Sequence, residues 1–209
     1  MAISPKLQER TKQDWAQRAQ EVAQYNQALP DRIKQLLLAL ERVDSNTPLN
    51  QLQHSLQTAT RAARSGASEE LIVAALCHDI AKTISVENHA SVAAEILKPF
   101  VAHSTYEVLR THTDFQAKYF HAHLDVKKDC REQYRRQPWY SLACQFADEW
   151  DMPARDPDYD SYSLEDFSLL LDKTFATPKA QSSSSSPLRL MLLNLRQAAV
   201  SFLRRHNSA

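Results

Sequence analysis

The sequence predicts an all-α fold, a bundle of helices, on three observations. Apolar residues recur three and four positions apart through most of the chain, which is the spacing that lines one face of an α-helix. Helix-start signals such as Ser-Pro and Ser-Glu-Glu precede several of these segments. Only one glycine occurs among the 209 residues, so the glycine-rich loops of phosphate- and dinucleotide-binding α/β folds are excluded.

The first four helices are predicted from these signals in chain order. A polar helix is expected over residues 4–27, because Ser-Pro opens it. A second helix, residues 31–40, carries isoleucine and leucine on one face. The third, residues 47–65, opens with Thr-Pro and stops before Gly66, a residue that suits the position after a helix end. Ser68 then caps the fourth helix.

The second half of the chain continues the pattern. Ser104, with a glutamate three positions later, reads as a capping box that opens one helix. The other helices are expected over residues 88–98, 124–137, 139–152 and 164–171.

One domain with two appendages is expected. Residues 1–30 would form an N-terminal helical extension, and residues 31–178 the main domain. Residues 179–187 hold the low-complexity run SSSSS and read as a linker, and residues 188–209 predict an appended apolar helix.

Composition narrows the classes of function. Lys+Arg and Asp+Glu both number 25, so no net charge favours nucleic acid, and no nucleic-acid partner is expected. Neither a signal peptide nor a transmembrane segment is predicted, which favours a cytoplasmic protein. The three cysteines lack the spacing of a thiolate metal site or a disulfide framework.

Potential metal ligands occur on successive predicted helices. Imidazoles and carboxylates form the mixed nitrogen and oxygen set that suits iron, manganese or zinc. An adjacent His-Asp pair diverges on a helix, so its two side chains can serve different ions. A single histidine is more often a satisfied polar residue, but the ordered set favours a metal site. The set is His54, His78, Asp79, His89, His112 and Asp151.

The order His … His-Asp … Asp resembles the HD-domain superfamily of helical metalloproteins, with the two additional histidines of its two-metal branches. The segment QLQHSLQTATRAARSGASEELIVAALCHDIAK, followed by HASVAAEIL, WDMPAR and SLEDF, is similar to the diiron HD oxygenases. These include the amino-hydroxyethylphosphonate oxygenase and, more distantly, myo-inositol oxygenase. The similarity covers about residues 33–170, and it makes residues 31–178 an expected HD domain with a dinuclear site.

The resemblance implies how the ligands are divided. One ion would be completed by His54, His78 and Asp151. The other would be held by His89 and His112, and Asp79 would bridge the two. Asp148 is the alternative to Asp151, since HD phosphohydrolases often place their aspartate in an Ala-Asp pattern; the following Trp-Asp and the basic residue four positions on favour Asp151.

The resemblance also implies the chemistry. It predicts an oxygenase with two iron ions, Fe(II)/Fe(III), that uses O2 to cleave a small hydroxylated substrate, with an organophosphonate as the candidate. A metal-dependent phosphohydrolase with manganese or zinc, acting on a phosphate ester or nucleotide, is the alternative. A non-catalytic binding protein is the third hypothesis. The oxygenase has a tyrosine and a glutamate ahead of its first histidine, whereas this chain has DSNTPLNQLQH. The resemblance therefore supports the metal site more strongly than it supports the substrate.

Three basic residues are candidates for substrate contact. Lys82, three residues after Asp79, is predicted to bind an anionic group and to take part in catalysis, although a solvated surface lysine is an equal alternative. Lys118 and Arg155 are further candidates for substrate binding, with a charged helix face as the simpler interpretation of Lys118.

Overall fold

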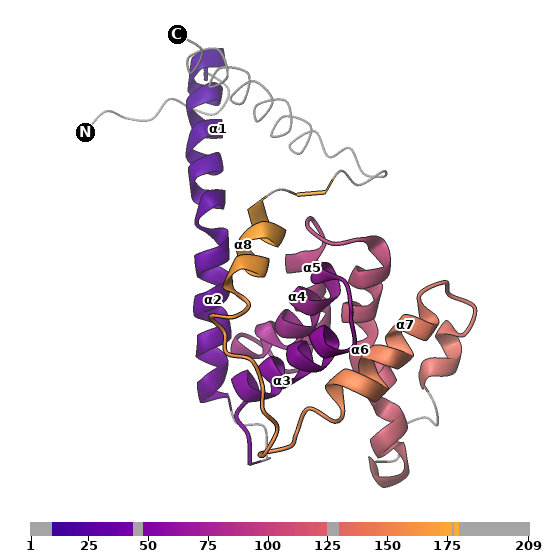
Figure 1. The fold of residues 1–209 in the computed structure, drawn as a ribbon. Coiled ribbons are helices and arrows are strands. Elements are labelled where there is room, and N and C mark those ends of the chain that lie inside the picture. The colour runs from indigo at the N-terminus through magenta and orange to yellow at the C-terminus, as the bar shows by residue number, and fades with distance from the viewer. Residues whose placement is uncertain (1–9, 44–47, 125–129, 177, 180–209) are drawn as a thin grey trace. The chain divides into compact units, whose positions relative to one another are not determined.

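The computed structural model describes residues 10–43, 48–124, 130–176 and 178–179, and this part of the chain is helical without a strand (Figure 1). The predicted all-α class is confirmed. The chain divides into two compact units, one of residues 1–29 with 181–209 and one of residues 30–180. The predicted C-terminal helix over 188–209 lies outside the described residues, as does the serine run.

The first unit contributes one described helix, α1 (Lys12–Gln27). Thr11 caps it, because its hydroxyl accepts from the Asp14 backbone N–H while the Asp14 carboxylate accepts from the Thr11 N–H. Thr11 has an extended backbone (φ −77°, ψ 168°), so no helix passes through it. The prediction of one helix from residue 4 to 27 was therefore wrong at its start.

The elements after α1 follow one another in chain order, with the long segment 152–167 between η5 and α8. They are α2 (Leu29–Ala39), η2 (Leu40–Arg42), α3 (Gln51–Arg64), α4 (Glu69–Cys77), η3 (Ile80–Thr83), α5 (His89–Leu97), α6 (His103–Leu124), η4 (Cys130–Tyr134), α7 (Tyr140–Gln145), η5 (Phe146–Asp151) and α8 (Ser168–Ala176). Among them η2, η3 and η4 are 3-10 helices and η5 is a π-helix.

Two predicted helix starts are corrected. Asn50, rather than Thr47, caps α3, and its side chain accepts from the Gln53 N–H in a reciprocal box. Ser104 lies inside α6, which already begins at His103, so the predicted capping box does not form. In contrast, Ser68 caps α4 as expected, and Gly66 takes the left-handed conformation (φ 76°) after α3.

The region before η5 differs most from expectation. The helix predicted over 124–137 is wrong, since α6 runs on to Leu124 and the described residues 130–134 form the 3-10 helix η4. The helix predicted over 139–152 is split into α7 and the π-helix η5. Periodicity does not distinguish these cases, because segments of five or six residues are too short to separate α, 3-10 and π spacing.

The core of the second unit forms around α4. Every residue from Ile72 to Cys77 is buried, and the helix packs against α3, α6 and α8. A helix that is apolar on all sides is buried in this way. Because the His78-Asp79 pair directly follows α4, this packing carries both side chains into the interior.

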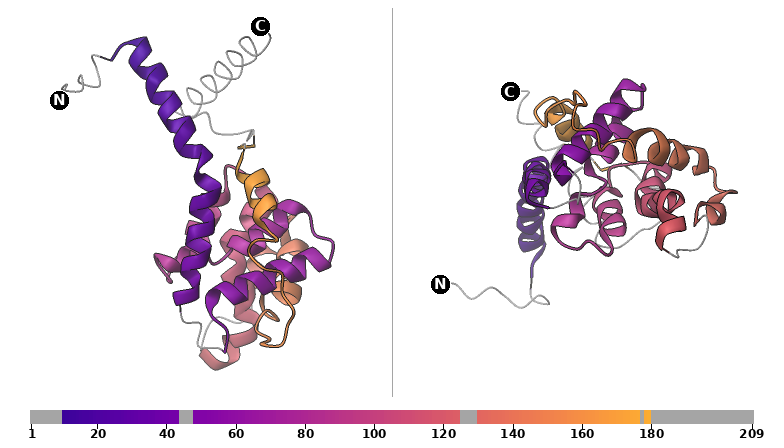
Figure 2. Two further views of the ribbon diagram at one scale, coloured as in Figure 1. Left: turned by 60° about the vertical axis from the view of Figure 1, so that its left-hand side comes forward. Right: turned by 90° about the horizontal axis from the view of Figure 1, so that it is seen from below.

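The segment between η5 and α8 returns along α3 (Figures 1 and 2). The Gln57 amide, buried on α3, donates to the Asp156 carbonyl (2.6 Å), and its oxygen accepts from the Asp156 N–H (3.3 Å). Further along, the Thr60 hydroxyl accepts from the Tyr162 N–H (3.0 Å). These bonds hold the end of η5 against α3.

Candidate metal centre

His78 and Asp79 lie at the junction of α4 and η3, and both are completely buried. His78 keeps a helical backbone, whereas Asp79 has φ −103° and ψ 4°, in the bridge region where the chain changes direction. This change at Asp79 lets two adjacent side chains reach the same interior volume.

The four interior histidines share one orientation. In each ring Nδ1 lies within hydrogen-bond distance of a backbone carbonyl, which can only accept, so Nδ1 carries the hydrogen of a neutral ring. The Nε2 lone pairs are then free to face the interior, as in metal-binding histidines. The pairs are His54 with Ala154 (2.9 Å), His78 with Ala75 (2.8 Å), His89 with Val86 (2.6 Å) and His112 with Leu109 (2.8 Å).

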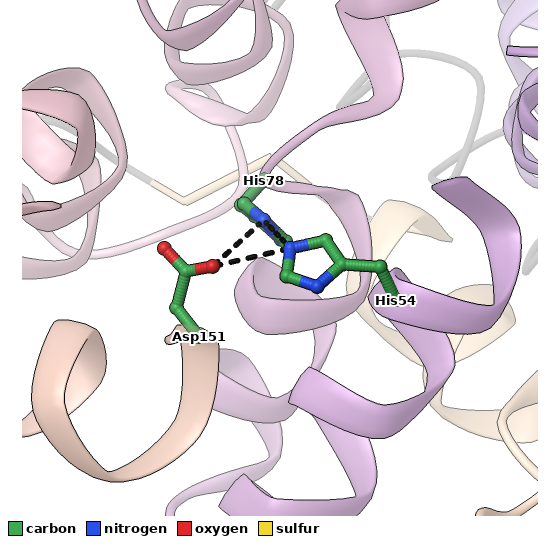
Figure 3. A group of neighbouring side chains, drawn as sticks. All are labelled: His54, His78 and Asp151. Carbon is green, nitrogen blue, oxygen red and sulfur yellow. Dashed lines mark hydrogen bonds and ion pairs between the residues drawn. The ribbon is translucent and has the colours of Figure 1, made fainter. Parts of the chain in front are cut away.

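The first cluster joins α3, α4 and η5 (Figure 3). Asp151 Oδ1 lies 3.1 Å from His54 Nε2 and 3.6 Å from His78 Nε2. The two Nε2 atoms are themselves 3.2 Å apart. All three side chains are at most 1% exposed.

Asp79 lies between this cluster and a second pair of histidines. Its Oδ2 is 3.1 Å from His78 Nε2 and 3.6 Å from His54 Nε2. Its Oδ1 is 3.0 Å from His89 Nε2 and 3.6 Å from His112 Nε2, and these two nitrogens are 3.3 Å apart. One carboxylate thus faces two pairs of imidazoles, one pair with each oxygen.

These residues fit divalent metal ions. Asp79 Oδ1 and Asp151 Oδ1 are buried and have no hydrogen-bond partner, and such groups are costly without one. Unprotonated Nε2 atoms about 3 Å apart repel each other unless a cation or a proton lies between them. Two groups of three residues each bring their potential ligand atoms within 4.8 Å of one another. The groups are His54, His78 and Asp151, and His78, Asp79 and His112. A cation would satisfy both the oxygens and the nitrogens.

Residues 52–152 match the family model of the HD domain. This part of the chain is an HD domain. The match begins in α3, ends just after η5, and contains all six candidate ligands. HD domains belong to a superfamily of metal-dependent hydrolases and oxygenases. No curated protein matches the chain.

The π-helix η5 contains both aspartates that are candidates for the last ligand position in the HD domain. Asp151 is completely buried in the first cluster. Asp148 lies 30% exposed and accepts from Arg131 with both oxygens (2.9 and 2.6 Å) and from the Tyr119 hydroxyl (2.6 Å). Asp151 therefore faces the candidate ligands, while Asp148 is engaged by a buried guanidinium.

Burial and neighbouring side chains shift the pKa values of several groups in the HD-domain centre. Burial would raise the pKa of both interior carboxyls, but the surrounding histidines hold the pKa of Asp151 below its usual range and that of Asp79 well below. Burial lowers the pKa of His78. It acts in the same direction on His112, but contact with Asp79 outweighs it and raises that pKa. His112 therefore binds a proton more readily than His78.

Of the three predicted substrate residues, only Lys82 adjoins the cluster. Its Nζ lies 2.7 Å from Asp79 Oδ2, and the side chain is 18% exposed. Lys118 is 51% exposed, with Nζ 3.7 Å from Asp148 Oδ2. Arg155 is half-buried and forms no hydrogen bond or ion pair with any described residue of the centre. His103, a histidine outside the centre, is exposed.

Two glutamines beside the centre were missed by the sequence reasoning. Gln51, on the first turn of α3, donates to Asp79 Oδ2. Gln116, on α6, donates to Asp151 Oδ2 (2.5 Å). The available signal was spacing, because Gln51 precedes His54 by three residues and Gln116 follows His112 by four, which places each on its histidine's helix face.

Proposed function

We propose that the chain is a metal-dependent enzyme that uses two metal ions to transform a small-molecule substrate. The observation that carries this proposal is the position of Asp79. Its Oδ2 faces His54 and His78, and its Oδ1 faces His89 and His112. A carboxylate between two pairs of imidazoles is placed to be shared by two ions.

In the proposed centre each ion has its own protein ligands. His54, His78 and Asp151 would hold one ion, His89 and His112 the other, and Asp79 would bridge them. When bound, such ions activate O2 or water and orient the substrate. An ion held by His89 and His112 would have fewer protein ligands, which would leave positions for the substrate.

Within this class we favour a diiron oxygenase, Fe(II)/Fe(III), that cleaves a small hydroxylated substrate with O2. The similarity of residues 33–170 to the phosphonate oxygenase supports it, and four imidazoles with two carboxylates form a donor set that suits iron. An organophosphonate is the candidate substrate. The Lys82 ammonium, partly exposed beside Asp79, would bind its negative charge.

A metal-dependent phosphohydrolase is the second candidate. The segment ahead of His54, DSNTPLNQLQH, has no counterpart of the oxygenase tyrosine and glutamate, and this observation favours the hydrolase. Lys82 would then stabilise charge that develops on the phosphate oxygens.

Anaerobic purification with metal analysis distinguishes the oxygenase from the phosphohydrolase. The oxygenase predicts two irons per chain, a mixed-valent electron paramagnetic resonance signal, and O2 consumption with a hydroxyphosphonate or a polyol. Occupancy by manganese or zinc, with release of phosphate from phosphate esters, would refute the oxygenase and support the hydrolase. Tight metal binding without either activity would refute both.

Replacing Asp79 tests the two-ion arrangement. Asp79→Asn is expected to lower the metal content from two ions per chain to below one, because the shared carboxylate is lost. The matched control is Asp148→Asn, which removes a carboxylate on η5 that pairs with Arg131 instead. Full metal content in Asp79→Asn would contradict the bridging role; the measurement is elemental analysis of both variants.

A further inference from the structure

The two carboxylates of the candidate centre have the same hydrogen-bond arrangement. In each, Oδ2 accepts from a glutamine amide, and Oδ1 is buried without a hydrogen-bond partner. The glutamines come from different helices, Gln51 from α3 and Gln116 from α6. In Asp151 the arrangement separates the oxygen that Gln116 holds from the oxygen that faces histidine nitrogens. In Asp79 the oxygen that Gln51 holds also faces His54 and His78.

The chemistry of the contact fixes its direction. An ionised carboxylate can only accept, so each glutamine must present its NH2 group to the aspartate and not its oxygen. The terminal torsion of an aspartate is broad and roughly two-fold, and it does not by itself select which oxygen faces which neighbour. A donor on one oxygen removes this freedom. Lys82 adds a second donor to Asp79 Oδ2, on the partly exposed side of the centre.

We propose that Gln51 and Gln116 are positioning residues that fix the rotation of Asp79 and Asp151. Asp151 then presents Oδ1 to one ion, and Asp79 keeps one oxygen toward each pair of histidines. The inference rests on the proposed two-metal function. Partners of metal ligands usually orient imidazoles; here neutral amides orient the carboxylates. The two glutamines differ in reach, because Gln116 acts only on Asp151, whereas Gln51 acts on the carboxylate that faces both pairs of histidines.

The test is titration of metal-free protein with Co(II) alone, followed by its visible absorption bands, which report the ligand geometry of each ion. Gln116→Met keeps the length of the side chain and removes the donor. We expect it to weaken one of the two Co(II) equivalents about 10- to 100-fold and to shift its bands, with the other equivalent unchanged. Gln51→Met is expected to weaken both equivalents.

Gln133→Met is the matched control, because Gln133 is exposed and its amide donates to the Cys130 carbonyl rather than to a residue of the centre. Thermal unfolding of the metal-free variants shows whether the fold is kept. Gln51 is buried and its replacement is the riskier one; Gln116 is partly exposed, so Gln116→Met decides the question by itself if Gln51→Met does not fold.

Two results would overturn the inference, and they are distinguishable. Wild-type protein that binds two Co(II) ions while folded Gln116→Met has the same affinities and superimposable bands refutes the positioning role alone. Wild-type protein that binds no Co(II) refutes the proposed two-metal function, and the inference with it. A purely structural glutamine would lower the unfolding temperature but leave the bands in place.

Discussion

Each interior imidazole depends on one backbone carbonyl. In His78, His89 and His112 that carbonyl belongs to the residue three positions earlier, so the local chain itself orients the ring. His54 differs, because its Nδ1 reaches Ala154, a hundred residues away on the segment after η5. The orientation of the His54 ring therefore depends on the docking of that segment, whereas the orientations of the other three rings do not.

Asp148 and Arg131 form an ion pair beside the centre that we expect to contribute to the stability of the fold. The Arg131 guanidinium is 5% exposed, and besides Asp148 it donates through Nε to the Phe115 carbonyl (2.6 Å). Burial alone would raise the pKa of Asp148, but hydrogen bonds from Arg131 and Tyr119 hold it below its ordinary value. The folded protein therefore releases this proton more easily than the unfolded chain does.

Asp148→Asn is expected to lower the free energy of unfolding at pH 7 by about 2–3 kcal/mol, because a buried guanidinium loses its anion. The folded-state pKa lies below the unfolded value, so this stabilisation is present above about pH 4 and is lost as the pH falls through the folded-state pKa. Urea unfolding from pH 7 to pH 3 should show the two proteins converging in acid.

The control for that experiment is Glu132→Gln, which breaks an exposed pair with Arg135. It should change stability by less than about 0.5 kcal/mol. An Asp148→Asn protein as stable as wild type at pH 7 would show that the Arg131 pair contributes no net stability.

Among the elements, η5 has the largest influence on the centre. The Met152 N–H donates to the Ala147 carbonyl (3.0 Å), five residues back, so this turn contains one residue more than an α-turn. The extra residue turns Asp151 into the interior while Asp148 stays with Arg131. π-turns of this kind often occur at functional sites.

Deleting Glu149, an exposed residue within η5, tests that role. The deletion would restore an α-turn and rotate Asp151 by about 100° relative to α7. We expect loss of at least one metal ion per chain with little change in helix content, measured by elemental analysis and far-ultraviolet circular dichroism. Glu149→Ala, which keeps the residue count, should retain both ions; full occupancy after the deletion would contradict the role of the extra residue.

At the scale of the whole molecule, the candidate centre belongs to one compact unit. Residues 30–180 contain all six candidate ligands and both glutamines, together with the buried helix α4. The described residues include no helix long and apolar enough to cross a membrane, and no disulfide joins their cysteines. The boundaries of the predicted extension, linker and terminal helix stay predictions.

A fragment of residues 30–180 is expected to fold cooperatively and to bind metal as the full chain does. Metal at a hundred times its dissociation constant adds about 2.7 kcal/mol to stability for each ion bound, which corresponds to an increase in Tm of roughly 5–10 °C per ion. Thermal unfolding of fragment and full chain with increasing Co(II) should give equal increases. A fragment that unfolds without cooperativity, or gains nothing from metal, would show that the flanking residues complete the domain.

The sequence by itself determined the all-α class and the six ligand-type residues that meet in the interior. These depend on local signals: apolar periodicity, cap residues and ligand-type side chains in a set order. Tertiary structure decided which aspartate of η5 faces the histidines, since both Asp148 and Asp151 fit a helical pattern and only the π-turn and the buried Arg131 separate them. It also decided the roles of Gln51, Gln116 and Ala154, because a hydrogen bond between segments as many as a hundred residues apart depends on packing, which has no local signal.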